Sequence, residues 1–426
     1  MILWSPKQFE VIQASELIQE LRLPMTVWTL DGPVRSGKTK PGTHSLARHA
    51  CRTFAGHDFI VANRTGRQLQ AINITYLREF AREHQMRLRH RGDYFELDSW
   101  LNGPPNRFWP LIGENVSSVD KAGGFTAAGA LVDETLQQPE EFVRVIMERC
   151  SSVPGSLIFL ITNPGPPKHW VHADFIEVAE SGKDPGIRRS AFTHVDNETL
   201  TPAQIRNIHK MWGSGVNYER RVLGKWIAAE GLVYPFFTES VSYPPADEIP
   251  YRYVVSVDHA RASVTHALLF GYYKEGIWAI REWRHDHERI GPLEDLRQAQ
   301  AIYSELGRGN NIANWICDPS APEFARVLGN LIGKQVIPAE NDVSLGIEKV
   351  TEGMGTGLLN ISPACKHLID ELHEYSWDEQ ASRRGEDKPV KIRDHGADAL
   401  RYFALTMAMA RARARQAPRI VSRVTS

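Results

Sequence analysis

The sequence has few cysteines and no apolar run long enough to cross a membrane. Its four cysteines are scattered over 426 residues without a C-x-x-C pair, which argues against a disulfide framework and against a zinc knuckle. No apolar run approaches the roughly 18 residues of a membrane span, and the N-terminus lacks the charged-then-apolar pattern of a signal peptide. These absences predict an intracellular protein with no membrane contact that is not secreted.

An excess of charge of one sign is also absent. The chain has 50 Lys and Arg against 51 Asp and Glu, a net charge of -1. No overall positive field therefore attracts nucleic acid, and any DNA contact needs a local basic patch. The hydrophobic content of 42% and charged content of 24% are those of an ordinary globular protein, and the length predicts two domains.

Short apolar runs alternate with helical patterns in the first half of the chain. The spacing of residues 66–85 predicts a helix, and strands are expected at 25–30, 58–63, 128–132 and 156–162. Buried strands separated by helices predict an α/β fold with a parallel sheet covered on both faces. Ligands bind at the carboxyl ends of the strands in such sheets.

The sequence GPVRSGKT directly follows the first of these strands and matches G-x-x-x-x-G-K-[ST]. Lys38 is expected to reach the β and γ phosphates of ATP, and the hydroxyl of Thr39 to ligate Mg²⁺. The alternative is a glycine-rich turn that matches by chance. The predicted nucleotide-binding loop consists of Gly32, Pro33, Val34, Arg35, Ser36, Gly37, Lys38 and Thr39.

A second acidic motif strengthens this interpretation. In GALVDET, residues 129–135, an apolar strand ends in two carboxylates. Asp133 is expected to hold Mg²⁺, and Glu134 to polarise the attacking water. The alternative is a helix cap followed by an exposed acid. Together the two motifs favour ATP hydrolysis.

Further residues are candidates for the same site. Thr162 and Asn163 end another apolar strand, where they could sense the γ-phosphate, although an Asn-Pro turn would look the same. Gln8 could read the adenine edge, although surface glutamines are common. Charge stabilisation in phosphoryl transfer needs an arginine, for which Arg35 and Arg149 are candidates, in cis or from a neighbouring subunit.

Acidic residues recur at strand ends in the second half. Residues 251–286 read as three strands, with Asp258 ending the first and Glu282 within the third. Asp318 ends a further strand, and Asp394 and Asp398 share one face of a predicted helix over 391–412. In a ribonuclease H-like mixed sheet these acids converge, and they are expected to bind two divalent metals (Mg²⁺ or Mn²⁺) that catalyse phosphodiester cleavage. The alternative is a set of unrelated turn and cap residues.

The order of these motifs resembles the large terminase subunit of tailed double-stranded DNA bacteriophages. The resemblance rests on GPVRSGKT, FTAAGALVDET, ITNPGPPKHW, VLGKWIAAEGLVYPFF, CDPSAPEF, YSWDEQASRRGEDKPVK and DHGADALRY. It implies an ATPase that pumps double-stranded DNA through the portal into a capsid, and a nuclease that cuts concatemeric genomes. It further implies a small terminase subunit as partner, a homo-oligomeric ring on the procapsid portal, and a location in the host cytoplasm.

By the same resemblance, Lys38, Thr39, Asp133, Glu134, Thr162, Asn163 and Gln8 map to the ATPase motifs, and Asp258, Asp318, Asp394 and Asp398 to the nuclease acids. The expected domains are a P-loop ATPase at 1–195, a helical connection at 196–245, a ribonuclease H-like nuclease at 246–412 and a basic tail at 413–426. Two other functions fit the residues. One is a DNA helicase or translocase with an inert C-terminal domain, and the other is a non-catalytic assembly protein that docks on a portal.

Overall fold

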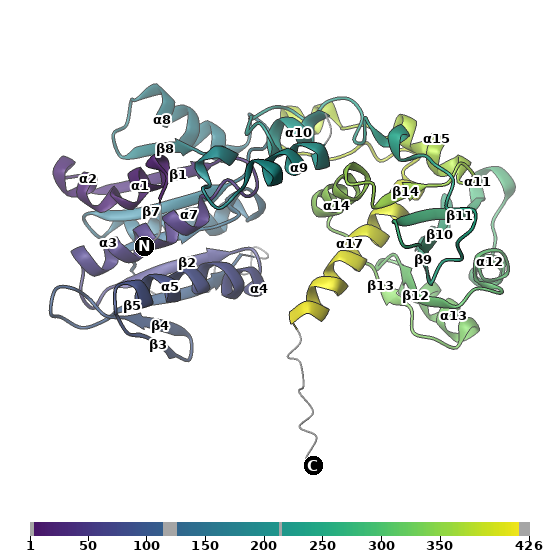
Figure 1. The fold of residues 1–426 in the computed structure, drawn as a ribbon, viewed down its shortest axis with the longest axis horizontal. Helices are drawn as coiled ribbons and strands as arrows, with labels where there is room; N and C mark the ends of the chain where they lie inside the picture. Colours follow the sequence, from purple (N-terminus) through teal and green to yellow (C-terminus); the bar gives the residue numbers. More distant parts are fainter. Residues whose placement is uncertain (1–3, 114–125, 213–214, 417–426) are drawn as a thin grey trace, which may run out of the picture. The chain divides into compact units, whose positions relative to one another are not determined.

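The computed structural model describes residues 4–113, 126–212 and 215–416, and within them it divides into two compact units (Figure 1). The first unit comprises the chain up to Arg206 with Val216–Ala228 and Ser382–Glu386. The second comprises Asn207–Gly215, Ala229–Ala381 and the chain from Asp387 onward. The segment expected to connect the domains, 196–245, is thus shared between both units. Among the described residues, no helix has the length and apolar character that a membrane span requires.

The first unit is built on an eight-stranded sheet in the order β3-β4-β5-β2-β6-β7-β1-β8. The strands from β5 to β8 in this order are parallel, whereas β3, β4 and β5 pair antiparallel. The strands are β1 (Met25–Asp31), β2 (Asp58–Asn63), β3 (Leu88–Arg91), β4 (Tyr94–Leu97), β5 (Asn106–Ile112), β6 (Gly129–Val132), β7 (Ser156–Thr162) and β8 (Ile187–Ala191). The parallel α/β fold predicted for the first half is confirmed.

Alternation along the central strands explains why helices cover both faces of this sheet. In β7, Leu157, Phe159 and Ile161 join one apolar cluster, and Ile158 and Leu160 join another. Because neighbouring side chains of a strand point to opposite faces, each cluster lies on its own face. The first cluster is shared with α1 (Pro6–Ile12), α2 (Ala14–Leu21), α3 (Thr39–Thr53) and α5 (Thr75–Glu83), and the second with α7 (Glu140–Ser151).

Two predicted helices of this region differ in detail. The helix expected at 66–85 consists of α4 (Gly66–Gln68), a π-helical turn η1 (Leu69–Ile74) and α5. The helical stretch expected at 201–226 contains α9 (Pro202–Trp212) and α10 (Gly215–Arg221), and residues 222–226 are not helical. The remaining short helices are η3 (Thr135–Gln137), η4 (His172–Ile176), α8 (Glu177–Ser181), η5 (His194–Asp196) and η6 (Phe237–Ser240).

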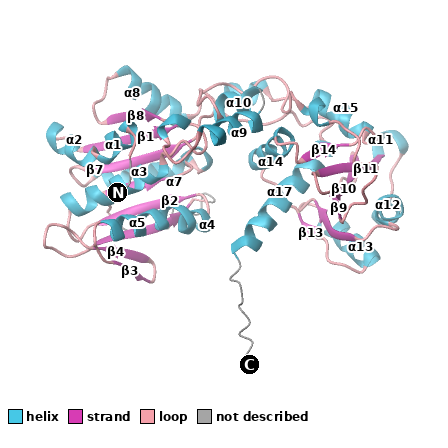
Figure 2. Ribbon diagram, viewed as in Figure 1, coloured by secondary structure: helices cyan, strands magenta, loops and turns pink. Residues whose placement is uncertain are grey.

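The second unit is built on a six-stranded mixed sheet in the order β13-β12-β9-β10-β11-β14 (Figure 2). The strands β9, β10 and β11 form an antiparallel meander, while β12 pairs parallel to β9 and β13 parallel to β12. The strands are β9 (Arg252–Asp258), β10 (Val264–Tyr272), β11 (Ile277–Asp286), β12 (Ile312–Cys317), β13 (Ile337–Pro338) and β14 (Leu359–Ile361). This is the mixed sheet predicted for the second half.

Helices cover this sheet too. An apolar cluster joins β9, β10 and β12 to α12 (Asp295–Ile302) and α13 (Pro322–Ile332). The long helix α17 (His395–Gln416) packs on β9 and β10, where Phe403 stacks on Phe270 at 3.6 Å between ring centres. The other helices are α11 (His287–Ile290), η7 (Tyr303–Gly307), α14 (Val343–Gly355), α15 (Lys366–Glu374) and α16 (Glu379–Arg383). Of the predicted tail 413–426, residues 417–426 lie outside the described residues.

Candidate active sites

The predicted nucleotide-binding loop connects the carboxyl end of β1 to the amino end of α3. Gly32 and Gly37 adopt φ values of 149° and 83°, which side chains other than glycine rarely adopt. A Cβ on Gly32 would also collide with the carbonyl group of Phe192. The first N–H groups of α3 are free of intrahelical partners, so they present a positive helix end beside the loop. This is the geometry that binds a phosphate.

Three side chains from other segments hold the carbonyl groups of this loop. His194 donates from Nε2 to Val34 O at 3.0 Å, and Asn197 donates from Nδ2 to Arg35 O at 2.7 Å. Gln8 donates from Nε2 to Gly37 O at 3.0 Å, while its Oε1 accepts from the Ser5 backbone. Both ends of the Gln8 amide therefore position the loop and cap α1, and a role for Gln8 in reading the adenine edge stays a prediction.

Lys38 is buried at the centre of the loop. Its Nζ donates to Gly32 O and Pro33 O, each at 3.0 Å, and to Asn163 Oδ1 at 2.8 Å. Burial lowers the pKa of Lys38 to about 8, against the raising effect of Glu134 and Asp133. Its hydrogen-bond partners are all neutral oxygens, so only the more distant carboxylates of Asp133 and Glu134 offset the cost of burying its charge. The arrangement fits an anionic phosphate at this amine.

The two acids after β6 lie beside Lys38. Asp133 is 5% exposed, and its Oδ2 accepts from Nδ2 of Asn73 at 3.0 Å. Burial, with the neighbouring charge of Glu134, raises the pKa of Asp133. A bound divalent cation reverses such a shift, because it favours the ionised carboxylate. The donor set of Thr39 and Asp133 therefore fits Mg²⁺.

Glu134 occupies a backbone conformation that is unusual for glutamate. Its φ of 54° and ψ of 39° lie in the left-handed region, which costs of order 1–3 kcal/mol for a residue other than glycine. The turn is held because Asp133 Oδ1 accepts from the Glu134 N–H at 3.0 Å and the Thr135 hydroxyl donates to Val132 O at 2.8 Å. Glu134 thus follows β6 at the carboxyl end of the strand, where its charge raises the pKa of Lys38.

The predicted coupling residues reach the same place by the neighbouring strand. Thr162 lies opposite Asp31 in the β1–β7 pair, so it ends at the base of the loop. Asn163 follows it and accepts from Lys38. The Thr162 hydroxyl donates to the Asn163 carbonyl at 2.9 Å, which stabilises the turn after the strand. Strand β7 lies between β1, which leads into the loop, and β6, which leads into the acidic pair.

The two candidate arginines are in different places. Arg35 is exposed at the tip of the loop, with φ of 65°. Arg149 lies near the amino-terminal end of β6, because its carbonyl oxygen accepts a hydrogen bond from the N–H of Ala127, which precedes that strand. The seven residues from Ala127 to Asp133 span roughly 20 Å when extended. Arg149 is therefore too far from Asp133 of the same chain to contact it.

Sequence reasoning missed an ion pair beneath the loop. Asp31, 0% exposed, accepts from Arg189 Nε at 2.8 Å and Nη2 at 2.7 Å, and from Trp226 Nε1 at 2.9 Å. Burial lowers the pKa of Arg189, but the charge of Asp31 raises it by more, so the pKa lies above its ordinary value. Asp31, which directly precedes Gly32, is therefore held by Arg189 of β8 and by Trp226, which follows α10.

Replacing Arg189 by alanine is expected to destabilise the first unit by about 3–5 kcal/mol, because Asp31 stays buried without its opposite charge. Thermal and urea unfolding measure the change. The exposed Lys183 serves as the control, since Lys183→Ala is expected to change stability by less than about 0.5 kcal/mol. A similar small effect for Arg189→Ala would show that the pair does not hold the loop.

The acids of the second unit gather at the carboxyl ends of β9 and β12. Asp258 ends β9, and Asp318 follows the parallel β12, with its N–H donating to Val257 O at 3.0 Å. Asp318 accepts from the Ser320 N–H at 2.8 Å and hydroxyl at 2.6 Å. Burial raises the pKa of Asp258 to about 6, and the charges of Asp398 and Asp318 add to the rise.

The start of α17 supplies the other acids. Asp398 accepts from Lys391 Nζ at 3.0 Å and from Arg401 Nη2 at 2.9 Å. The same Lys391 Nζ lies 3.0 Å from Asp394 Oδ2, which is buried and has no hydrogen bond of acceptable geometry. His395 was not singled out from the sequence, yet its Nδ1 lies 2.8 Å from Asp258 Oδ2.

This donor set fits divalent metal ions. Asp258 carries a raised pKa, and the ammonium of Lys391 lies between the carboxylates of Asp394 and Asp398. Each feature indicates negative charge that requires a cation. Glu282, in contrast, is engaged elsewhere: it binds His266 and the backbone N–H groups at the start of α15.

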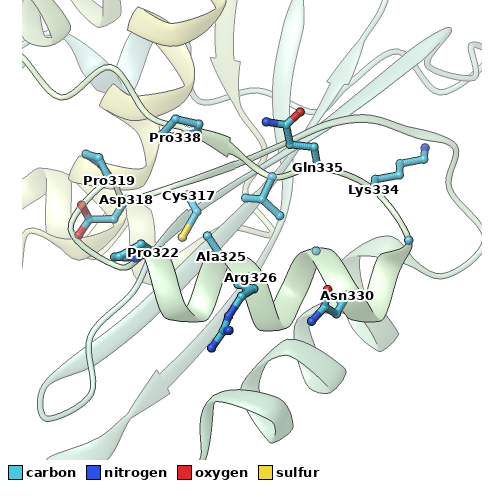
Figure 3. A pocket seen from close by; sticks show the side chains of 13 residues that line it. Cys317, Asp318, Pro319, Pro322, Ala325, Arg326, Asn330, Lys334, Gln335 and Pro338 are labelled. Atoms are coloured by element: carbon cyan, nitrogen blue, oxygen red, sulfur yellow. The ribbon is translucent and has the colours of Figure 1, made fainter.

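A pocket of about 690 Å³ opens beside Asp318 (Figure 3). Asp318 and Pro322 lie at one end, and Asn330 and Lys334 lie toward the other end of α13. Lys334 donates to Ile312 O at 2.8 Å, which fixes its side chain. Further lining residues include Arg326, which is exposed, and Gln335. Arg326 and Lys334 give the pocket positive charge next to the acid cluster.

Known proteins resemble this chain in sequence and in fold. Residues 30–241 match the family model described as terminase large subunit, T4likevirus-type, N-terminal. The structure is similar to the large terminase of a thermophilic bacteriophage, with 30% identity over 96% of this chain and 100% of that chain, and a TM-score of 0.87. Structures of that terminase with ADP and with ATP-gamma-S match at 29% identity over 95% of this chain and 100% of that chain, with TM-scores of 0.85 and 0.84.

No curated protein matches the chain significantly. The matched residues 30–241 nevertheless include the loop, the two acids after β6 and the predicted coupling residues, and the structural match covers 96% of the chain. With nearly the whole chain aligned at 30% identity, the likeness is one of family and not of fold alone. The chain belongs to the family of phage large terminase subunits.

Proposed function

We propose that the protein is a viral genome-packaging motor that hydrolyses ATP and cuts DNA. The observation that carries the proposal is one chain with two separate acidic sites. In the first unit, Lys38, Asn163 and the acids after β6 surround a phosphate-binding loop. In the second, Asp258, Asp318 and Asp398 converge on one edge of a mixed sheet. Phage large terminases, the family of this chain, include solved complexes with ATP-gamma-S and with ADP.

In the ATPase site each residue has a proposed task. Lys38 would bind phosphate oxygens in place of its loop carbonyls. Thr39 and Asp133 would hold Mg²⁺, which would supply positive charge to the phosphates. Glu134 accepts a proton from, or orients, the attacking water. Asn163 contacts Lys38 directly, so a change at the phosphate reaches β7 through one hydrogen bond. Arg35, exposed on the loop, is the proposed cis charge stabiliser, and Arg149 is left only a role toward a neighbouring subunit.

In the nuclease site Asp258, Asp318 and Asp398 would hold two divalent metals, with Asp394 as a further ligand. Such a pair activates water and stabilises the leaving oxygen of the phosphodiester. His395 touches Asp258, so it orients that carboxylate. Lys391, now between Asp394 and Asp398, would withdraw toward solvent as metal takes its place, because its side chain is 61% exposed.

The proposed partners follow from this function. They are double-stranded DNA, the portal protein, the small terminase subunit and further copies of this chain in a ring on the procapsid portal in the host cytoplasm. A direct test is ATP-dependent protection of linear DNA from DNase by procapsids that carry a matching portal. Protection is expected. ATP turnover with neither protection nor cleavage would favour a translocase with an inert second unit, and absence of ATP turnover would favour an assembly protein.

The pocket along α13 is the proposed path of the DNA backbone toward Asp318. Arg326→Ala is expected to weaken DNA binding uniformly across sequences, and to lower the slope of log affinity against log salt by about 1. Binding is measured in the Asp258→Ala background, so that the DNA is not cut. Arg289 on α11 is exposed and does not line the pocket, so Arg289→Ala is the control. An unchanged salt slope for Arg326→Ala would remove this pocket from the DNA path.

A further inference from the structure

A charged histidine is enclosed in the second unit by two carboxylates. His266 is 0% exposed; its Nε2 lies 3.1 Å from Glu282 Oε2, and its Nδ1 lies 3.3 Å from Glu371 Oε1. Burial alone would lower the pKa of His266, but the hydrogen bonds and charges of both glutamates raise it to about 9. Such a group is expensive to bury, and it is not required by the apolar core of the sheet.

Each of the two carboxylates also binds the beginning of a helix. Glu282 accepts from the N–H groups of His367 at 2.8 Å and Leu368 at 3.0 Å, at the start of α15. Glu371, on α15, accepts from Gly396 at 2.5 Å and Ala397 at 3.3 Å, at the start of α17. A carboxylate at a helix N-terminus satisfies free N–H groups and the positive helix end. The chain of contacts runs from β11 through α15 to α17.

The beginning of α17 is the part of the helix that carries the nuclease residues. Gly396 lies between His395, which contacts Asp258, and Asp398. A Cβ on Gly396 would lie 2.7 Å from Glu371 Oε2 and 2.7 Å from His266 Cε1, so only glycine allows this approach. From the sheet side, His266 is the direct cross-strand partner of Asp258 in the β9–β10 pair. The two strands and the helix start therefore meet at this network.

We propose that His266, Glu282 and Glu371 form a positioning triad that fixes the start of α17 against β9 and β10, so that Asp394 and Asp398 face Asp258 at the spacing that divalent metal requires. The three residues touch neither the DNA nor the metal; they act through the helix backbone. The inference rests on the proposed nuclease site. It explains why a charged network lies at this depth, where an apolar cluster of similar volume would cost less.

The test separates positioning from plain stability. Glu371→Gln keeps the size of the side chain and removes its charge, and Gly396→Ala adds a methyl group that presses the helix start against Glu371 and His266. The stability control is Ile302→Ala, which leaves a cavity in α12 within the apolar cluster that joins β9, β10 and β12 to α12 and α13. Mn²⁺ binding is measured on the full chain by calorimetry, with thermal unfolding and ATP turnover recorded for every variant.

The expected result is a 10- to 100-fold weaker Mn²⁺ affinity of the second unit in Glu371→Gln and in Gly396→Ala, the range for partners that orient metal ligands. Ile302→Ala is expected to lower the unfolding temperature and to leave the affinity unchanged. Equal Mn²⁺ affinity in the intact chain and in both positioning variants would overturn the proposal. A variant whose second unit does not fold, seen as a lost transition in thermal unfolding, is replaced by the other. If the intact chain binds no Mn²⁺ at Asp258, the proposed nuclease fails, and the triad fails with it.

Discussion

Replacing Glu134 by alanine is expected to reduce ATP turnover by about 10²- to 10⁴-fold while ATP still binds. The reason is chemical: a positioned base contributes about that much to the rate, whereas the phosphate contacts belong to Lys38 and the loop. Glu134 lies in a left-handed turn held by Asp133 and Thr135, so its carboxylate is aimed by the backbone. Alanine removes the carboxylate and keeps that turn.

Phosphate release measures turnover, and a fluorescent nucleotide measures binding. Lys38→Ala is the informative comparison, because it is expected to lose binding as well. Glu140, exposed in the first turn of α7, supplies the matched charge control, and Glu140→Ala is expected to turn over ATP normally. Normal turnover by Glu134→Ala would remove this residue from the water-activating role and would require another base near Lys38.

Asp258→Ala is expected to abolish DNA cleavage and to leave ATP turnover within about twofold of the intact chain. Asp258 joins β9 to the helix acids through His395, and it lies beside Asp318, so its loss removes the carboxylate common to the cluster. The effect is expected to exceed the roughly 100-fold loss typical of residues that merely orient metal ligands. ATP turnover is preserved because the loop, its acids and their partners all lie in the other unit.

Supercoiled plasmid reports cleavage with Mn²⁺ or Mg²⁺, and phosphate release reports the ATPase on the same preparation. Glu275, exposed in the turn between β10 and β11, provides the control Glu275→Ala, for which both activities are expected to persist. Loss of both activities in a folded Asp258→Ala protein would point to one shared site. Persisting cleavage would place the nuclease chemistry on other residues.

The sequence predicted the central strands well and the edge strands poorly. Strands β1, β2, β6 and β7 are continuous apolar runs because both faces of the sheet are covered, and such runs stand out. Strands β3 and β8 are polar and half-exposed, as in the sequences LRHR and IRRSA, so no pattern distinguishes them from loops. The π-helical turn in the helix predicted at 66–85 depends on packing and not on residue spacing.

The site residues divide in the same way. Motifs with fixed spacing placed Lys38, Asp133 and Asn163 in the sequence, and the structure brings them together. Residues that act through long-range contacts carry no local signal; Asn73 meets Asp133 across 60 positions, and His395 meets Asp258 across 137. Arg149 shows the opposite case, since the residue type fits a charge stabiliser but α7 leads it to the other edge of the sheet.

The central claim is that one chain carries a nucleotide-hydrolysing site and a separate metal-dependent nuclease. The most direct measurement is cleavage of supercoiled plasmid by the intact protein with Mn²⁺, beside Asp258→Ala and an EDTA control, with ATP turnover read from each preparation. The account predicts cleavage by the intact protein alone, abolished by EDTA, and ATP turnover by both proteins. Cleavage that survives Asp258→Ala, or ATP turnover lost with it, would contradict the account.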